Sequence, residues 1–300
     1  MRILITGGTG FIGTSLIKKL TNSKHEILVL TRQKKKRFKN IFFYKCDLNK
    51  QQTYKKKIEK FKPECLVHLA WQGIPNFSRY NCDKNIKNSK TLIKFVLKNK
   101  FCKKIIVSGS CFEILKNKGK SNEKTKICND NYFSRSKNYL RFWLKNLSKR
   151  YTFDYIWLRI FYVYGPGQRC NSLIPYVINS LKNNQKPNIS NYSNIIDFIY
   201  LDDLIKILKF FISKKSINGI FNAGSGKPVK VYNICKLIEY KINKKNIYFN
   251  RKSFKEKKTK VYFWADKKKL LTTMNYFNFT NLSLGLRKTI LFYNKNYLNA

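Results

Sequence analysis

The 300-residue sequence carries 63 lysine and arginine residues against 15 aspartate and glutamate residues, which gives a formal net charge of +48. Its hydrophobic content of 43% and aromatic content of 15% supply ample material for a core and exclude a disordered chain. The charge indicates either a polyanion-binding surface or drift of the composition. We favour drift, because the lysines are spread along the whole chain. We therefore expect no specific nucleic-acid partner.

Cysteine and histidine usage excludes the common metal sites. The eight cysteines are scattered without a Cys-x-x-Cys pair, and the two histidines, His25 and His68, show no zinc-ligand spacing. We expect reduced thiols and no metal. No apolar run reaches the ~20 residues of a membrane span. We expect a cytoplasmic protein without a leader segment.

Apolar runs and helical patterns alternate along the first half of the chain. The predicted strands lie near 2–6, 26–31, 41–44, 64–69, 103–108 and 153–159. The predicted helices between them lie near 12–21, 51–60, 79–99 and 133–150. This alternation is typical of βαβ units on a parallel sheet.

The rhythm changes after Gly165. The later predicted elements are helices near 171–183, 202–213, 231–243 and 282–296 and strands near 195–200 and 220–222. We predict an α/β fold, a doubly wound Rossmann sheet with a smaller C-terminal substrate domain. The nucleotide domain is expected over 1–165, with 193–224 returning to it, and the substrate domain over 166–192 and 225–300.

A glycine-rich turn follows the first predicted strand and opens a helical pattern. In Thr6-Gly7-Gly8-Thr9-Gly10-Phe11-Ile12-Gly13, three glycines allow a tight turn, close approach to a pyrophosphate and packing of helix on strand. The helix N-terminus then presents free N–H groups to the anion. The alternative is a merely structural turn. Its position favours a dinucleotide site built on Gly7, Gly10 and Gly13.

The end of the second predicted strand indicates which dinucleotide is bound. NAD-binding chains place an acid there for the ribose 2′-hydroxyl, whereas this sequence has Thr31 followed by Arg32. A guanidinium suits a 2′-phosphate. NADP(H) is therefore favoured, and NAD(H) is the alternative. Asp47, after the third strand, is a candidate for the adenine edge or a solvated loop acid.

The motifs together resemble the extended short-chain dehydrogenase/reductase family, the NAD-dependent epimerase/dehydratase group that acts on nucleotide sugars. Besides the glycine turn they are His68-Leu69-Ala70, Asn85, Ser108-Gly109-Ser110, Ser136-Lys137, Leu158 to Pro166, Asp197 to Asp203 and Phe221 to Gly226. The resemblance covers almost the whole chain. It implies hydride transfer between a nicotinamide and a sugar carbon, usually C4.

The resemblance also assigns roles to single residues. Ser110 fits the hydroxyl that hydrogen-bonds the sugar oxygen, and Lys137 fits the lysine that stabilises a tyrosine phenolate and holds the nicotinamide ribose. The remaining cofactor-binding positions are Phe11, Ile12, Leu48, Leu69 and Ala70. The other residues expected at the substrate are Cys111, Phe112, Tyr162 and Arg169.

The family's acid/base tyrosine is missing from its usual place. The residue four positions before Lys137 is Phe133, which cannot carry a proton. The neighbouring Tyr132 is the candidate replacement, although five residues' spacing turns it about 140° around a helix from Lys137. The alternative is a packing or surface aromatic at Tyr132. Cys111-Phe112 stand where family dehydratases carry a carboxylate pair, which argues against a 4,6-dehydratase, and Glu113 is expected to contact substrate or cap a loop.

Three functions therefore remain open. The favoured one is a nucleotide-sugar reductase or epimerase acting at C4. The second is a catalytically impaired family member that binds dinucleotide or nucleotide sugar without turnover, and the remote third is a polyanion-binding protein. By analogy with the family we expect a homodimer through the helices near 85–98 and 133–150. The candidate interface residues are Leu92, Phe95, Val96, Leu140, Trp143, Leu144 and Leu147.

Overall fold

The chain divides into two compact units. The computed structural model describes residues 1–33, 35–98, 100–117, 119–250 and 261–297. The first unit comprises Met1–Leu115, Thr125–Ile160 and Ile205–Phe221. The second comprises Lys116–Lys124, Phe161–Leu204 and Asn222–Ala300. Residues 251–260 and 298–300 of the expected substrate domain lie outside the described residues.

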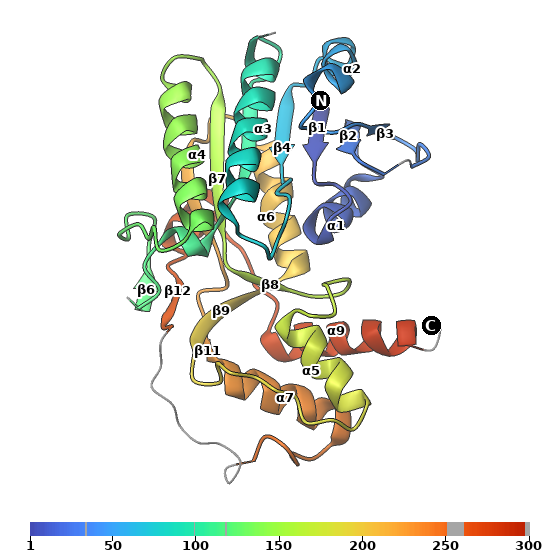
Figure 1. Cartoon of the computed structure of the whole chain (residues 1–300), viewed down its shortest axis with the longest axis vertical. Helices are drawn as coiled ribbons and strands as arrows, with labels where there is room; N and C mark the ends of the chain where they lie inside the picture. Colours follow the sequence, from blue (N-terminus) through green and yellow to red (C-terminus); the bar gives the residue numbers. More distant parts are fainter. Residues whose placement is uncertain (34, 99, 118, 251–260, 298–300) are drawn as a thin grey trace. The chain divides into compact units, whose positions relative to one another are not determined.

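The first unit is built on a seven-stranded sheet with the order β10-β7-β5-β4-β1-β2-β3 (Figure 1). Its strands are β1 (Arg2–Thr6), β2 (Glu26–Thr31), β3 (Ile41–Lys45), β4 (Cys65–His68), β5 (Lys104–Ser110), β7 (Asp154–Ile160) and β10 (Gly219–Ala223). Every pairing from β7 to β3 is parallel. The strand order reverses between β1 and β4, where doubly wound sheets bind their ligands. The predicted doubly wound Rossmann sheet is confirmed.

Helices cover the strands of this sheet. They are α1 (Phe11–Leu20), α2 (Lys55–Phe61), α3 (Arg79–Lys98), α4 (Tyr132–Ser148) and α6 (Leu201–Ser213), with short 3-10 turns η1 (Gln51–Thr53) and η2 (Cys111–Glu113). Figure 1 shows α3 and α4 side by side, and the two are in contact. Their inner apolar residues, including Leu92 and Leu144, pack with strand residues such as Leu66 and Ile105 in one buried core. Burial of these apolar faces holds the helices on the sheet.

The second unit contains two small sheets. The strand β9 (Ile195–Tyr200) lies between β11 (Pro228–Lys230) and β8 (Tyr162–Tyr164), and β12 (Phe263–Ala265) pairs with β6 (Gly119–Ser121). The helices are α5 (Leu173–Lys182), α7 (Val231–Asn243), α8 (Lys268–Met274) and α9 (Leu282–Tyr297). α5, α7 and α9 contact one another.

The unit boundaries differ from the expected domain boundaries at 116–124, at 161–165 and in the segment 193–224. Only residues 205–221 of this segment group with the first unit. The physical reason is that β9 pairs with β8 and β11 in a separate sheet. The role of the second unit in substrate binding stays a prediction. No helix in the described part of the chain is long and apolar enough to cross a membrane.

Candidate active site

The glycine turn after β1 forms a cradle suited to a phosphate. Gly7 has a φ of +72°, and a Cβ there would lie 2.7 Å from the backbone nitrogen of Ala70. At Gly13 a Cβ would overlap the carbonyl oxygen of Gly7. The helix α1 begins after Gly10 with no side-chain cap and no acidic residue in its first turn. Because no side chain caps the N–H groups of the first turn and no acid opposes an anion there, the residues fit the pyrophosphate of a dinucleotide.

The predicted residues of the first helical turn and of the neighbouring strand ends lie at the same edge of the sheet. Phe11 and Ile12 are half-buried in the first turn of α1. Thr31 is buried at the end of β2, and its hydroxyl accepts a hydrogen bond from the Gln33 amide. Arg32 is exposed, so its guanidinium is accessible to a ligand beside β2.

Asp47 and Leu48 follow β3 and are half-buried. The Asp47 carboxylate accepts hydrogen bonds from the backbone N–H of Asn49 at 2.9 Å and from its amide group at 2.6 Å. One Asp47 oxygen therefore organises its own loop. This arrangement leaves the adenine role of Asp47 a prediction.

A buried chain of hydrogen bonds supports the edge at β4. The Thr6 hydroxyl lies 2.7 Å from His68 Nδ1, and His68 Nε2 lies 2.8 Å from the Ser89 hydroxyl. Ser89 donates its hydrogen to the carbonyl of Asn85, so His68 must donate from Nε2 and accept at Nδ1. Burial and the nearby Lys137 charge lower the pKa of His68 to about 3, which keeps the ring neutral. This network was not predicted from the sequence.

The network continues to the loop after β4. The Asn85 side chain accepts a hydrogen bond from the backbone N–H of Gln72 at 2.7 Å and donates to the backbone carbonyl of Gln72 at 2.9 Å. The loop residues Leu69 and Ala70, predicted to bind cofactor, are half-buried next to Gly7. Trp71 between them and Gln72 is consequently held by hydrogen bonds on its C-terminal side.

Ser110 ends β5 and is fixed by a capping box. Its backbone N–H donates to Glu113 Oε1 at 2.7 Å, and its hydroxyl accepts from the Phe112 N–H at 3.2 Å. Phe112 is half-buried, and Cys111 is buried with 3% exposure. The Ser110 hydroxyl, which is predicted to bind the substrate, thus has a defined position at the carboxyl end of β5.

Glu113 lies in the interior of the first unit with 0% exposure. Its carboxylate accepts hydrogen bonds from Trp157 Nε1 at 2.9 Å and from Arg159 Nε at 3.3 Å, and Arg141 Nε lies 3.4 Å away. Of the two expected roles, the structure assigns Glu113 the capping role. A full burial among two guanidinium groups leaves it no access to a substrate.

Lys137 is almost completely buried on α4, with 4% exposure. Its ammonium group donates to the Ser108 carbonyl at 2.7 Å and lies 3.9 Å from the centre of the Trp71 ring. Burial lowers the pKa of Lys137 to about 7, although the charges of Glu113 and Cys82 act in the opposite direction. The hydrogen bond to Ser108 ties Lys137 to the strand that ends at Ser110.

The Phe133 ring occupies the helix face that carries Lys137. It is buried with 6% exposure, and its centre lies 5.7 Å from the Lys137 ammonium. Phe77 stacks on it at 4.4 Å, while Trp71 and Phe112 meet it edge-on at 5.5 and 6.1 Å. We call Trp71, Phe77 and Phe112, which pack around Phe133, the aromatic cage. Three aromatic neighbours therefore pack a phenyl ring beside Lys137, at the place where the resemblance predicts a tyrosine.

Tyr132 is the first residue of α4 and has a different environment. Its side chain is 45% exposed, and its ring lies 5.8 Å from the guanidinium of Arg135. It lines a surface groove together with Arg79 and Asp83 of α3. The structure therefore brings Phe133, and not Tyr132, beside Lys137. An acid/base role of Tyr132 stays a prediction.

Two expected substrate contacts belong to the second unit. Tyr162 is half-buried in β8, and its ring lies 5.8 Å from that of Phe198 and 6.4 Å from that of Phe263. Arg169 is exposed after the glycine-containing turn at 165–167. Their contacts with a substrate stay predictions.

Most residues expected to form a dimer interface are buried in the core of their own chain. Leu92, Val96, Leu140, Leu144 and Leu147 are buried there, and Phe95 and Trp143 pack against the same cluster. The five buried side chains cover the sheet, which leaves the homodimer a prediction.

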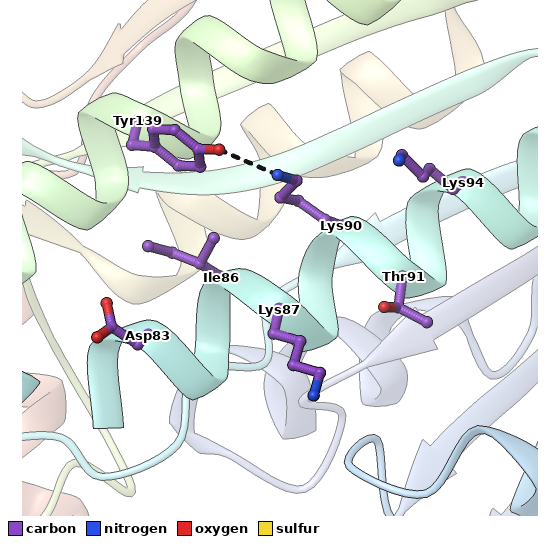
Figure 2. A pocket seen from close by; sticks show the side chains of 7 residues that line it. All are labelled: Asp83, Ile86, Lys87, Lys90, Thr91, Lys94 and Tyr139. Carbon is purple, nitrogen blue, oxygen red and sulfur yellow. Dashed lines mark hydrogen bonds between the residues drawn. The ribbon is translucent and has the colours of Figure 1, made fainter. Parts of the chain in front are cut away.

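The outer surface of α3 and α4 carries both charged and aromatic side chains, among them the exposed Tyr80, Tyr139 and Phe142. A groove there is lined by Asp83, Ile86, Lys87, Lys90, Thr91, Lys94 and Tyr139 (Figure 2). In Figure 2 the Lys90 ammonium points at the Tyr139 hydroxyl, to which it donates at 3.0 Å. The described residues contain no group of three or more His, Cys, Asp or Glu side chains that could hold a metal ion.

The sheet order and the glycine cradle define a doubly wound Rossmann protein. The model of the NAD dependent epimerase/dehydratase family matches residues 3–224, and the chain belongs to this family. The dTDP-4-dehydro-6-deoxyglucose reductase of Escherichia coli is 27% identical over 265 residues, which cover 82% of this chain and 83% of the reductase.

Solved structures show the same fold. The UDP-glucose 4-epimerase of Thermotoga maritima with UDP-glucose matches with a TM-score of 0.84 and 22% identity, over 99% of this chain and 100% of that chain. The dTDP-glucose 4,6-dehydratase of Bacillus anthracis in complex with NAD matches with a TM-score of 0.84 and 20% identity, over 99% and 97%. At these identities the likeness carries the fold alone.

Proposed function

We propose that this protein is an NAD(P)-dependent nucleotide-sugar reductase or epimerase that acts at sugar C4 by hydride transfer. The observation that carries the proposal is the bond from Lys137 to Ser108, because it holds a buried cation beside the strand that presents Ser110. The cradle at Gly7, Gly10 and Gly13 lies at the carboxyl end of β1 in the same sheet. The family membership and the reductase among its relatives support this assignment.

Each group has a part in the proposed reaction. The dinucleotide, when bound, supplies or accepts the hydride. The amides of the glycine turn hold its pyrophosphate, and the loop at Leu69 and Ala70 borders it. Ser110 hydrogen-bonds the sugar oxygen that changes between carbonyl and hydroxyl. Lys137 holds the ribose and its positive charge stabilises negative charge that develops on that oxygen.

We favour NADP(H) over NAD(H) because Arg32 follows a strand that ends in Thr31 instead of an acid. The test compares Arg32→Gln with Arg37→Gln, an exposed arginine of the same loop. Loss of a charge-assisted contact to a 2′-phosphate is expected to weaken NADPH binding about 10-fold or more. NADH binding should stay unchanged. Equal effects on both dinucleotides would contradict the preference.

The second candidate is a family member that binds dinucleotide or nucleotide sugar without turnover. One observation favours it: the Phe133 ring is locked in the aromatic cage at the position of the family's phenol. Loss of general acid/base assistance typically costs 10²–10⁴-fold in rate.

The deciding experiment follows NADPH absorbance with a panel of nucleotide-linked 4-keto sugars for wild type and Phe133→Tyr. Substrate-dependent NADPH loss in the wild type supports the reductase. Activity that emerges only in Phe133→Tyr supports the impaired member. Silence of both variants, together with no interconversion of C4 epimers, would contradict both hydride-transfer activities.

The remaining partner assignments are also proposals. We propose a nucleotide sugar as substrate, a cytoplasmic location and a homodimer. Polyanion binding through the net charge of +48 stays a remote alternative. It would weaken steeply with salt, whereas specific dinucleotide binding would weaken less.

A further inference from the structure

The proton for carbonyl reduction needs a source other than the family's phenol in this chain. Phe133 lacks an ionisable group, and the aromatic cage surrounds it with Trp71, Phe77 and Phe112. Tyr132, at the next helix position, is 45% exposed beside Arg135. On the inner face of α4, therefore, no other tyrosine replaces the phenol hydroxyl expected at position 133.

The other polar groups of this edge are already engaged. His68 uses both ring nitrogens, one with Thr6 and one with Ser89. Glu113 is buried between Arg141 and Arg159. The Ser110 hydroxyl accepts a bond from Phe112 and can orient a sugar oxygen, but a serine hydroxyl is too weak an acid to supply the proton by itself.

Lys137 has the geometry of a proton donor. An ammonium group has three N–H bonds. Among the hydrogen bonds that the described residues form, the Lys137 ammonium donates one, to the Ser108 carbonyl. The Trp71 ring covers another side at 3.9 Å. At least one further N–H is thus left over by these two contacts.

We propose that the Lys137 ammonium group itself gives the proton to the sugar oxygen, in place of the missing tyrosine. This inference rests on the proposed function. Hydride addition to the C4 carbonyl carbon turns the π electron pair of the C=O bond into an alkoxide lone pair. The alkoxide takes a proton from Lys137 Nζ, the N–H bond breaks, and a neutral amine remains. Solvent restores the ammonium group before the next turnover.

The surroundings explain why this lysine can release a proton. The Trp71 and Phe133 rings lie beside Nζ, and burial lowers the pKa of Lys137 to about 7. The charged and titratable groups that face it are Glu113 from η2, Cys82 from α3 and the neutral His68 from β4. Glu113 and Cys82 favour the ammonium form of Lys137, but the Glu113 charge is also paired with Arg141 and Arg159. A donor near neutral pH is the favourable case for acid catalysis.

The ionisation of Lys137 can be measured without turnover. The Trp71 indole lies against the ammonium group, so its fluorescence should change as Lys137 loses its proton. We expect a transition near pH 7 in the wild type, and its absence in Lys137→Arg, which keeps its charge, and in Trp71→Phe, which removes the reporter. A transition that persists in Lys137→Arg would contradict the assignment.

The proton transfer is tested by NADPH consumption with the reducible sugar. Lys137→Arg keeps the charge and a donor for the ribose, yet should lose activity about 100-fold or more. The wild-type rate should fall above about pH 7, and Phe133→Tyr should move this fall to higher pH. Tyr139→Phe, an exposed tyrosine of the same helix, is the matched control.

The possible failures are distinguishable. Full activity of Lys137→Arg overturns the inference and leaves the proposed function standing. A loss of 100-fold in Tyr132→Phe with an active Lys137→Arg assigns the proton to Tyr132. A wild type that shows the fluorescence transition but reduces no sugar overturns the proposed reductase, and the proton transfer with it.

Discussion

Two lysines that face aromatic rings differ sharply in what they can do. Lys137, on the inner face of α4, lies 3.9 Å from the Trp71 ring and donates to a backbone carbonyl. Lys90, on the outer surface of α3, lies 5.1 and 5.5 Å from the rings of Tyr139 and Trp143 and donates to the Tyr139 hydroxyl (Figure 2). Water still reaches the outer pair. The comparison shows that burial, more than aromatic contact, lowers the pKa of a lysine ammonium group.

The largest effect is expected from the buried charges behind Ser110. Glu113→Gln keeps the shape of the side chain but leaves Arg141 and Arg159 without their counter-charge. Breaking a buried ion pair costs about 3–5 kcal/mol of unfolding free energy. Urea denaturation measures this loss, and Glu59→Gln, which removes an exposed acid, is the control. Equal stability of the two variants would refute the buried triad.

The next largest effect is the contribution of Lys137 to the pH dependence of the unfolding free energy. The folded pKa of about 7 lies below the usual 10.5, so the unfolded chain binds more protons between these values. The wild type should therefore gain stability as pH rises through this window, by about 1.4 kcal/mol per pH unit from this group. The gain is lost as pH falls through 7. Parallel stability curves of the wild type and Lys137→Met between pH 7 and 10 would contradict the lowered pKa.

The smallest effect is expected on the outer surface. Lys90→Met removes the hydrogen bond to Tyr139 and two contacts with aromatic rings. Exposed cation–π contacts contribute about 0.5–1 kcal/mol, so thermal unfolding should shift only slightly. A loss as large as that of Glu113→Gln would contradict the assignment of these contacts to an exposed surface.

Much of the nucleotide edge followed from local sequence. Gly7, Gly10 and Gly13 lie where a strand gives way to a helix, and the alternation of apolar runs with helical patterns predicted β1 to β5 and β7. Short elements such as β6, β8, β11 and β12 were missed. Each has three residues and exists through pairing with a distant partner, as Phe263 pairs with Gly119.

The sequence by itself determined the alternation of strands and helices of a Rossmann fold, the glycine turn and the absence of a tyrosine four residues before Lys137. These features depend on residue identity and local spacing. Only the tertiary structure decided the environments. It buried Glu113 between two arginines, placed His68 between Thr6 and Ser89, and brought Trp71 from the loop after β4 against Lys137. The physical reason is that desolvation and charge pairing depend on which distant residues share the interior, and local spacing carries no record of them.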